Sequence, residues 1–464
     1  DHAANNRSGH LGHALVQCEN GDILAFYPNC SDDGGGHSAV GWMEYKRSRD
    51  FGKTWEPPMI YTYSKQYFQL GINTSVMAEK AVVTNDGTIV IFHLLCDISE
   101  NPLWEPYRVP TYSRSFDQGL TWSKAEEIDK DCGRIYDAVY YEKEILDYKL
   151  GQELMEKYKD VPKHEIENHN NIEEMRKKSN TEFMNMKRNL IIGIRKTHNF
   201  VPNHKTSDFL VPYTSSGCTA ACMYCYLVCH YNKCAYLRLF VNREKMLEKI
   251  IKTAEKSEKN LTFEIGSNSD LILENTITNN LVWTIENFKN AKKGHLTLPT
   301  KFSMVEPILG LDHQGKVTIR MSVNPKEIIS RVELGTSSLE NRIKAINSLC
   351  EAGYQVGILI APVIMIDGWK EKYLELIQEL ESKLSPQSKS KVFFEVIFMT
   401  YSFVHDKINS EAFPTAMKIY DKEKMQGRGK GKYMYKQALR DDGKEFLEEQ
   451  LKKHFPNNKI EYMV

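Results

Sequence analysis

Three cysteines in the middle of the chain carry the clearest chemical signal. Cys218, Cys222 and Cys225 follow one another at the spacing C-x3-C-x2-C, just after Gly217 in a loop-like stretch. Thiolates are the usual protein ligands of iron–sulfur clusters. Four cysteines fill a closed cluster, whereas three leave one iron with an open position. The spacing therefore predicts a cluster whose open iron holds a substrate or cofactor as well as passing electrons.

Two other interpretations of these cysteines stay open. The thiols could be small apolar side chains of a core, or they could bind zinc. Structural zinc takes four ligands and favours paired C-x2-C spacings. Cys229, His230 and Cys234 lie close enough along the chain to supply a fourth ligand. Zinc in a non-catalytic DNA-interaction module is thus an alternative, although the spacing favours iron and sulfide.

The composition is that of an ordinary globular protein with two or three domains. The 464 residues include 61 basic and 61 acidic side chains, so net charge gives no indication of nucleic acid as a partner. No apolar run is long enough to span a bilayer, and we expect no membrane partner. Five of the ten cysteines fall between 218 and 234, which is typical of a metal site in a reducing compartment. The chain begins with Asp, so we expect its N-terminus to be trimmed or incomplete.

Residues 1–134 differ in character from the rest of the chain. They are rich in Gly, Asp and aromatic residues, and strand-like runs lie at 13–16, 22–27 and 88–93. The pattern S-x-D-x-G-x-T-W occurs twice, at 48–55 and at 115–122. In such a turn the Asp accepts backbone N–H bonds, the Gly supplies a positive φ and the Trp covers the turn. The repeat resembles the Asp-box (BNR repeat) of sialidase-type β-propellers.

This resemblance implies an incomplete propeller. Sialidases hold the substrate carboxylate with an Arg of the first blade, and Leu11 stands at that position here. The segment is also too short for six blades. We therefore expect an all-β, propeller-like fragment or fusion segment with no chemistry of its own. A glycan-binding or sialidase-like role for residues 1–134 is the alternative.

Between this segment and the cysteines the chain becomes rich in Lys and Glu. Apolar residues at helical spacing predict a helix over 146–159. The strongly polar stretch 161–188 favours a solvated connector. The apolar run 190–196 predicts a buried strand that ends in two cations.

Beyond the cysteines, strands and amphipathic helices alternate. We expect strands at 261–265, 295–302, 317–323, 355–363 and 391–397, and helices at 243–257, 271–288, 338–352 and 370–384. With the extended stretch 209–213 these segments predict an α/β fold, a partial (β/α)6 barrel whose site lies at the C-terminal ends of the strands. Polar residues at those ends are candidates for the site: Ser269, Asp270, Lys301, Ser322 and Asn324.

Several motifs in order resemble one family. The cysteine spacing, with an aromatic before the last Cys, is similar to the signature of radical S-adenosylmethionine (SAM) enzymes. The runs VYYE (139–142), IRKT (194–197), CMYCYL (222–227), SVN (322–324), IAPV (360–363) and DGW (367–369) fall in the order seen in spore photoproduct lyases. The similarity covers about residue 139 to the C-terminus. Behind the Asp-box segment 1–134, it implies three parts: the N-terminal part of the lyase 135–207, the radical SAM barrel 208–400 and a DNA-contacting hairpin and helix 401–464.

The resemblance implies a carbon–carbon lyase that repairs 5-thyminyl-5,6-dihydrothymine, a thymine dimer of UV-irradiated spore DNA, to two thymines. It implies a [4Fe-4S] cluster on the three cysteines, with SAM at the open iron as the source of a 5′-deoxyadenosyl radical. The implied partners are UV-damaged double-stranded DNA and an electron donor such as ferredoxin or flavodoxin. The implied location is the cytoplasm, in the spore core of a spore-forming bacterium. A radical SAM enzyme acting on another substrate is the alternative.

Family matches imply roles for the candidate residues. The five strand-end residues would line the SAM pocket, and Tyr224 and Tyr226 match aromatics that pass the radical back toward SAM. Many members carry a hydrogen-donating Cys where Ser267 stands here. A serine O–H bond is too strong to give a hydrogen atom to a carbon radical. Cys229 lies one helical turn beyond Cys225, so we expect Cys229 to be the donor and Cys234 the second choice.

The resemblance also implies DNA contacts near the C-terminus. The basic, glycine-rich loop 424–432 resembles the family's hairpin that props the duplex open, since the dimer must be flipped out to reach a buried site. Its cations suit phosphate contacts: Lys424, Arg428, Lys430 and Lys432. A His-Arg pair common after the sixth strand is replaced by Met399 and Thr400, so we expect lesion contacts there to differ.

Overall fold

The structure, a computed structural model, describes residues 7–8, 13–31, 41–61, 74–84, 87–97, 107–123, 125–127, 136–230 and 236–464. The chain divides into two compact units, residues 1–129 and residues 130–464. None of the helices in the described ranges has the length and apolar character needed to cross a membrane.

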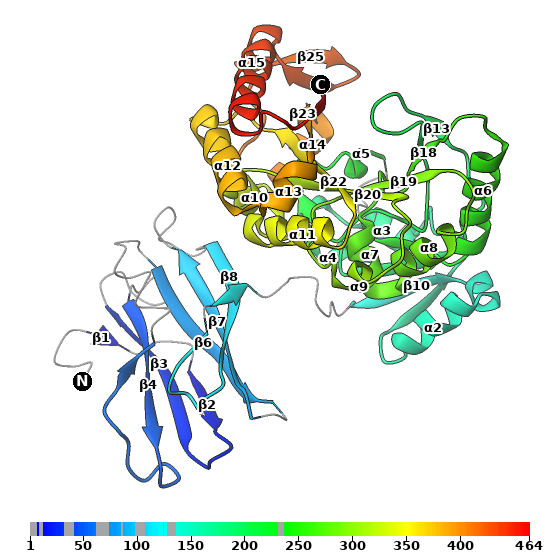
Figure 1. Ribbon diagram of the computed structural model, residues 1–464. Coiled ribbons are helices and arrows are strands. Elements are labelled where there is room, and N and C mark those ends of the chain that lie inside the picture. The colour runs from blue at the N-terminus through cyan, green and yellow to red at the C-terminus, as the bar shows by residue number, and fades with distance from the viewer. Residues whose placement is uncertain are drawn as a thin grey trace. The chain divides into compact units, whose positions relative to one another are not determined.

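In its described residues the first unit contains only β-strands and turns, as its turn-rich sequence predicts. One antiparallel sheet contains β1 (Arg7–Ser8), β2 (Ala14–Gln17), β3 (Ile23–Ser31), β4 (Gly41–Ser48) and β5 (Met59–Ile60). A second contains β6 (Thr74–Val83), β7 (Ile89–Asp97), β8 (Tyr107–Ser115) and β9 (Glu126–Glu127) (Figure 1). Buried side chains of both sheets, among them Phe26 and Ile91, form one apolar cluster.

The two sequence repeats of this unit adopt the expected turn. Asp50 Oδ1 accepts the N–H of Thr54 at 2.8 Å, and Asp117 Oδ1 accepts the N–H of Thr121 at the same distance. The glycine of each repeat has a positive φ, 86° in the first and 82° in the second. The repeated octapeptide therefore encodes a repeated turn.

The second unit begins with a small sheet whose strands run parallel except for β15 at its edge. Its order is β11 (Lys163–Ile166), β10 (Ala138–Glu142), β12 (Asn189–Gly193), β17 (Arg238–Phe240) and β15 (Ser215–Ser216). The expected helix and buried strand are present as α2 (Lys149–Lys157) and β12.

The expectation of a solvated connector at 161–188 is wrong. This stretch adds β11 to the sheet and forms α3 (Glu173–Lys177) and α4 (Phe183–Met186). Met175, Phe183 and Met186 are buried. Because these apolar residues are few among many polar ones, the average polarity of the stretch concealed them.

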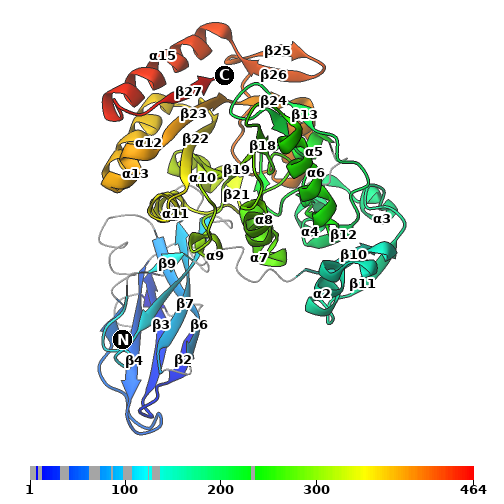
Figure 2. The same ribbon diagram turned by 45° about the vertical axis from the view of Figure 1, so that its right-hand side comes forward.

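The main sheet of the second unit is the expected partial barrel. Its order is β13 (Val201–Pro202), β14 (Phe209–Leu210), β18 (Thr262–Glu264), β19 (His295–Thr300), β20 (Val317–Val323), β22 (Gln355–Val363), β23 (Phe393–Phe398) and β27 (Ile460–Met463). All neighbours from β14 to β27 are parallel. The six expected strands are confirmed. The antiparallel β13 at one edge and β27 from the end of the chain at the other complete the eight-stranded sheet. The sheet curls into a half-barrel (Figure 2).

A buried ion network shows which side of the curled sheet is concave. Arg320 on β20 reaches Glu264 on β18 at 2.5 Å and Glu395 on β23 at 3.1 Å. Neither β18 nor β23 adjoins β20 in the sheet. The three side chains meet because the sheet bends around them. Alternate residues of β20, which include Ser322, thus face the interior of the barrel.

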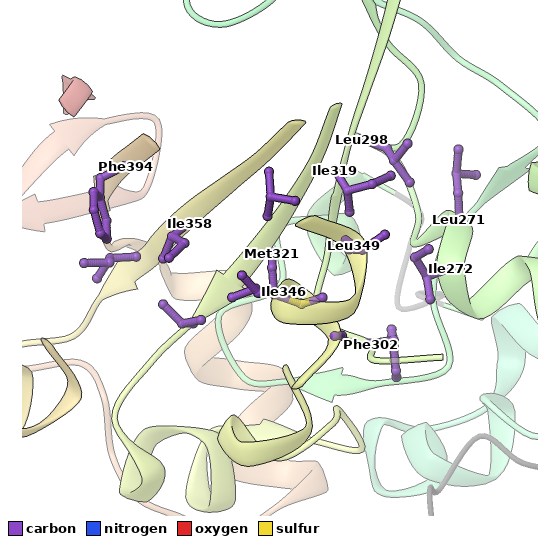
Figure 3. Packing of buried hydrophobic residues seen from close by; sticks show 14 of the residues in the cluster. Leu271, Ile272, Leu298, Phe302, Ile319, Met321, Ile346, Leu349, Ile358 and Phe394 are labelled. Atoms are coloured by element: carbon purple, nitrogen blue, oxygen red, sulfur yellow. The ribbon is translucent and has the colours of Figure 1, made fainter. Parts of the chain in front are cut away.

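Helices cover the convex face of the barrel. They are α6 (Arg243–Lys256), α7 (Leu271–Thr278), α8 (Asn280–Phe288), α11 (Leu339–Glu351) and α12 (Trp369–Lys383). Figure 3 shows apolar side chains of the strands, such as Ile319 and Met321, packed with Leu349 and Ile346. Alternation along β20 therefore directs apolar residues outward to the helices and polar residues inward to the site.

The single helix expected at 271–288 is wrong, since it divides into α7 and α8. Asn279 between them has a φ of 55°, in the left-handed region. The Asn275 side chain accepts the N–H groups of Leu281 and Val282 at 2.9 and 3.1 Å. A side chain thus caps the start of α8, an effect that apolar spacing does not report.

A hairpin and two helices follow the last expected strand. The antiparallel order is β24 (Thr400–Ser402), β26 (Lys432–Tyr435) and β25 (Met425–Gly429). The turn of the hairpin, residues 429–431, has positive φ throughout. The helices are α14 (Phe403–Ala412), which starts directly after β24, and α15 (Gln437–His454). Figure 1 shows β25 and α15 at one end of the half-barrel, coloured orange to red.

Candidate active site at the mouth of the barrel

A cavity of about 320 Å³ opens at the C-terminal ends of the barrel strands. Most residues that the sequence singled out line it, although they come from elements far apart in the chain. The lining includes Cys218, Cys222, Tyr224, Cys225, Tyr226, Ser267, Ser269, Asp270, Lys301, Ser322 and Thr400. The fold therefore gathers the cysteine loop and the strand-end residues at one place, as a parallel barrel requires.

The cysteine loop is fixed by hydrogen bonds to its neighbours. Its short strand β16 (Ala221–Cys222) pairs antiparallel with β21 (Glu333–Leu334). From α14, a ring nitrogen of His405 lies 3.0 Å from the carbonyl oxygen of Cys225, and Asn409 donates to the carbonyl of Met223 at 2.7 Å. The backbone that carries the three thiols is thus held from two sides.

The three thiols fit the expected iron–sulfur cluster. All are half-buried and all reach the same cavity. Burial raises the pKa of the Cys218 thiol to about 12 and also raises the pKa of Cys222, so both thiols are neutral until a metal takes them as thiolates. The N–H of Ala220 lies 3.4 Å from Cys218 Sγ, where it would donate to a thiolate.

Among the described side chains, no three His, Cys, Asp or Glu residues stand close enough to bind one shared metal ion. An iron–sulfur cluster does not require such closeness, because each cysteine binds a different iron.

A buried lysine lies behind the cysteine loop. Lys187 is 3% exposed, and its ammonium donates to the carbonyl oxygens of Cys218, at 2.9 Å, and Ala220. Lys187 also lies over the ring of Phe183, 5.1 Å from its centroid. A positive charge is therefore built in beside the thiols. Its position just before β12 gave no signal in the sequence.

Glu333 is the functional residue that sequence reasoning missed. It is buried on β21, opposite Cys222 in the strand pair, and it joins four side chains of the site. Its carboxylate accepts from Lys301 at 3.0 Å, from Asn324 at 2.8 Å and from Tyr224 on one oxygen, and from Arg342 at 2.8 Å on the other. Burial alone would raise the pKa of Glu333, but Lys301 and Arg342 hold it at about 2. A carboxylate between two cations is thus ionised beside the cysteine loop.

Lys301 presents its ammonium at the cavity. It donates to Ser322 Oγ at 2.5 Å and to the carbonyl of Ala361 at 2.9 Å, and its side chain keeps 21% of its surface exposed. Asn324, by contrast, lies behind the cavity and does not line it. Its amide bonds Glu333 and, through its oxygen, the Tyr373 hydroxyl at 2.9 Å. Lys301 and Ser322 therefore face a ligand, whereas Asn324 holds Glu333 in place.

Asp270 ties two strand ends together. Its carboxylate caps α7 by accepting the N–H of Leu273 at 3.3 Å, and it accepts the N–H of Lys301 at 2.9 Å and the Thr300 hydroxyl at 2.8 Å. Burial raises its pKa. The neighbouring Ser269 hydroxyl bonds that of Ser215, which also donates to the buried Glu274 at 2.5 Å. Most hydrogen bonds of the Asp270 carboxylate therefore hold the start of α7 and the end of β19 together at the wall of the cavity.

The two tyrosines occupy different surroundings. The Tyr224 hydroxyl donates to Glu333, and its ring lies 5.5 Å from the Lys301 ammonium. Tyr226 is 47% exposed and donates to the carbonyl of Ser267. The helix α5 (Leu227–His230) follows at once. The side chain of Cys229 and the whole of Cys234 lie outside the described residues.

The basic hairpin is connected to the cavity through β24. Thr400 lines the cavity and pairs with Met434 on β26. Arg428, Lys430 and Lys432 are exposed, whereas Lys424 forms a 2.8 Å ion pair with Asp367. Among the described residues, Arg428, Lys430 and Lys432 form no ion pair and are exposed to solvent, and β24 connects their hairpin to the cavity.

Comparisons with known proteins agree on one family. The family profile for spore photoproduct lyase matches residues 135–464. The chain is 32% identical over 334 residues to the spore photoproduct lyase of Bacillus subtilis (strain 168), covering 70% of this chain and 97% of that protein. It is 30% identical to that of a Geobacillus species, covering 98% of it.

The comparison with solved structures points the same way. A spore photoproduct lyase variant with bound AdoMet (SAM) and dinucleoside spore photoproduct is 28% identical, with a TM-score of 0.67. The match covers 71% of this chain and 99% of that one.

Proposed function

Because the chain belongs to the spore photoproduct lyase family, we propose that its barrel cavity converts 5-thyminyl-5,6-dihydrothymine in UV-damaged DNA to two thymines. The protein is a radical SAM lyase that uses a [4Fe-4S] cluster and S-adenosyl-L-methionine. The observation that carries the proposal is the meeting of Cys218, Cys222 and Cys225 with Lys301 and Ser322 around one cavity.

The three cysteines would hold the cluster through their thiolates. When bound, the cluster would supply the electron for reductive cleavage of SAM, which is the source of the radical that acts on the lesion. The protein's part is to place the reactants, because a radical this reactive attacks whatever lies nearest. The paired strands β16 and β21 and the contacts from α14 keep the thiols in position.

SAM would lie against the strand-end residues. Ser269, Lys301 and Ser322 present polar atoms to the cavity, and Lys301 brings a positive charge that suits the carboxylate of SAM. Asp270 and Asn324 would support the SAM site indirectly, because Asp270 holds the end of β19 and Asn324 holds Glu333.

The hydrogen that quenches the product radical would come from a thiol. Ser267 lines the cavity but has no weak bond to break. We assign the donation to Cys229, with Cys234 second: the S–H bond breaks, a C–H bond forms on thymine, and a thiyl radical remains. Tyr226 and Tyr224 would then pass a hydrogen atom to that thiyl radical and return the radical toward SAM.

The C-terminal hairpin would contact the DNA. Lys424, Arg428, Lys430 and Lys432 suit phosphates on either side of a flipped dimer. In this proposal residues 401–464 include the DNA-contacting part, and residues 1–134 take no part in the chemistry. The barrel of residues 208–400 is completed by β13 and β27, and the supporting sheet of residues 135–207 by β15 and β17. A ferredoxin or flavodoxin would donate the electron, in the cytoplasm of the spore core.

An anaerobic assay tests the proposal. The protein is reconstituted with iron and sulfide and mixed with SAM, dithionite and a synthetic dinucleotide lesion, and chromatography follows 5′-deoxyadenosine and repaired thymidylyl-thymidine. We expect both products, and neither when Cys218, Cys222 or Cys225 is changed to Ala. Formation of 5′-deoxyadenosine without repair would keep the radical chemistry and place in question either the lesion as substrate or the hydrogen donor, since Ser267 stands where a thiol is common.

A further inference from the structure

Phe403 is an exposed aromatic residue that the proposed chemistry leaves unused. It is the first residue of α14, and 58% of its surface is exposed. A single exposed apolar residue is common in proteins and means little alone. The position of Phe403 beside the cavity and the basic hairpin, however, indicates a role in binding.

Phe403 stands between the cavity and the basic hairpin. The strand β24 runs from Thr400, which lines the cavity, to Ser402, which pairs with Lys432 of the hairpin. Phe403 comes next, and its N–H donates to the carbonyl of Gly431 in the hairpin turn at 3.1 Å. The mouth of the cavity and the turn are thus joined by a stretch of four residues that ends in this aromatic ring.

The ring lies directly on the hairpin turn. A Cβ added to Gly431 would come within 2.3 Å of Phe403 Cδ1, so the ring covers the place where any larger residue would project. Gly431 also has a φ of 67°, which favours glycine on its own account. One part of the ring therefore packs on the turn while the remainder faces solvent.

Exposed cations lie on the strands and turn beside the ring. Arg428, Lys430 and Lys432 all belong to this hairpin, and all are exposed. A phosphate backbone that follows these cations would bring its bases near the ring. Aromatic side chains beside a basic track bind unstacked bases by stacking, largely regardless of base identity.

We propose that Phe403 stacks on a base that loses its neighbour when the dimer leaves the duplex, and so keeps the gap open. This inference rests on the proposed repair function, because only a flipped lesion leaves such a base. Its ligand class is a nucleobase of damaged duplex DNA, and Phe403 acts by positioning the duplex, not by touching the reacting atoms.

The fold of α14 does not depend on this ring. The helix is capped by Ser402, whose hydroxyl accepts the N–H of His405 at 3.3 Å. His405 and Asn409 bond the helix to the cysteine loop, and its own residue Ile408 is buried. A Phe403→Ala variant should therefore keep the cysteine loop in place and isolate the contribution of the ring.

The test compares two substrates. The parent protein, Phe403→Ala and Phe403→Trp are each assayed on the dinucleotide lesion, which has no neighbouring bases, and on a duplex that carries one lesion. Stacking on one base predicts that Phe403→Ala lowers kcat/KM on the duplex by about 5- to 100-fold. On the dinucleotide it should stay within about twofold, and Phe403→Trp should restore duplex repair. Val201→Ala on β13, which removes a side chain that is 52% exposed, is the control and should alter neither.

A second readout follows the duplex itself. A fluorescent 2-aminopurine next to the lesion should brighten less on binding of Phe403→Ala than of the parent, because fewer bases are unstacked. Equal duplex repair by Phe403→Ala and the parent would overturn the inference, and so would an equal loss on both substrates. If the parent repairs neither substrate, the proposed function is wrong and the inference falls with it.

Discussion

The Lys301 ammonium lies 3.0 Å from the buried Glu333 carboxylate, and this ion pair joins the end of β19 to the strand that pairs with the cysteine loop. Tyr224 and Asn324 bond the same carboxylate oxygen, and Arg342 bonds the other. A displacement of Glu333 would therefore disturb both the SAM side and the cluster side of the cavity. The Lys301–Glu333 pair thus connects the side of the cavity expected to bind SAM with the side that carries the cysteines.

Removal of the Glu333 charge should destabilise the second unit. Glu333→Gln leaves the buried Arg342 and the partly buried Lys301 without their shared anion, which predicts a loss of about 3 kcal/mol in the free energy of unfolding. Urea denaturation of the full chain measures it. The control is Glu448→Gln on α15, whose 2.5 Å pair with Lys452 is solvent-exposed and should contribute less than about 1 kcal/mol. Equal effects of the two changes would contradict a special role for Glu333.

The same carboxylate predicts an acid limit. The pKa of Glu333 is about 2 in the folded protein, below the ordinary value of 4.5. A depressed carboxyl pKa stabilises the fold fully above the unfolded value and less as pH falls from 4.5 through 2. We expect the stability difference between the parent and Glu333→Gln to be constant from pH 7 to pH 5.5 and to shrink below pH 4.5. A difference that grows on acidification would show the opposite sign.

The Lys187 ammonium should raise the reduction potential of the cluster. Reduction adds a negative charge, which a buried cation near Cys218 stabilises. Lys187→Met should therefore make the potential more negative, as measured by redox titration of the electron paramagnetic resonance signal. Lys177→Met on α3, which removes an exposed cation, should leave the potential unchanged. An unchanged potential in Lys187→Met would contradict an electrostatic role.

The sequence predicts the barrel because its signals are local. Strands such as 355–363, which is apolar without interruption over 358–363, are followed by a helical pattern. The site residues follow from strand ends: Lys301 and Ser322 lie where parallel strands finish and do line the cavity. Both the strands and the site residues at their ends can be predicted because a single local stretch of sequence determines them.

Other features depend on contacts between distant residues. Glu333 is an ordinary acidic residue in sequence, and only the pairing of β21 with β16 places it beside Cys222. Lys187 acquires its role by burial against a loop about thirty residues away, and Asn324 turns out to support Glu333 instead of lining the cavity. Buried polar networks are formed by tertiary contacts between distant residues, so a local sequence pattern does not predict them.

A thiol at the Ser267 position should substitute for Cys229 as hydrogen donor. If Cys229 quenches the product radical, Cys229→Ala should lower the yield of repaired thymidylyl-thymidine and produce radical by-products. Adding Ser267→Cys, at a position that lines the cavity, should restore clean repair. Chromatography of the dinucleotide reaction measures both. Clean repair by Cys229→Ala alone would transfer the assignment to Cys234, whose own Ala variant is the matched comparison.

Cations of the hairpin should set the salt dependence of DNA binding. Each phosphate contact contributes about 0.9 to the slope of log K against log salt concentration. Changing both Lys430 and Lys432 to Ala should reduce that slope by about 1.8 on lesion-bearing duplex, as measured by fluorescence anisotropy. The control is Lys256→Ala at the end of α6, an exposed cation far along the chain from the hairpin. A loss of affinity at constant slope would indicate damage to the hairpin instead of lost phosphate contacts.

His93 should make the first unit sensitive to mild acid. It is buried on β7 between Tyr61, whose hydroxyl lies 3.0 Å from one ring nitrogen, and Thr111, 2.5 Å from the other. Burial lowers the pKa of His93 to about 4 from 6.5, so the fold accepts only the neutral ring. Below pH 6.5 His93 binds a proton in the unfolded chain but not in the folded one. The free energy of unfolding therefore decreases as the pH falls from 6.5 to about 4. Between pH 7.5 and pH 5.5 the free energy of unfolding of this unit should decrease by about 1 kcal/mol. Hydrogen exchange of β7 amides in the full chain measures it, and His93→Gln should remove this part of the pH dependence.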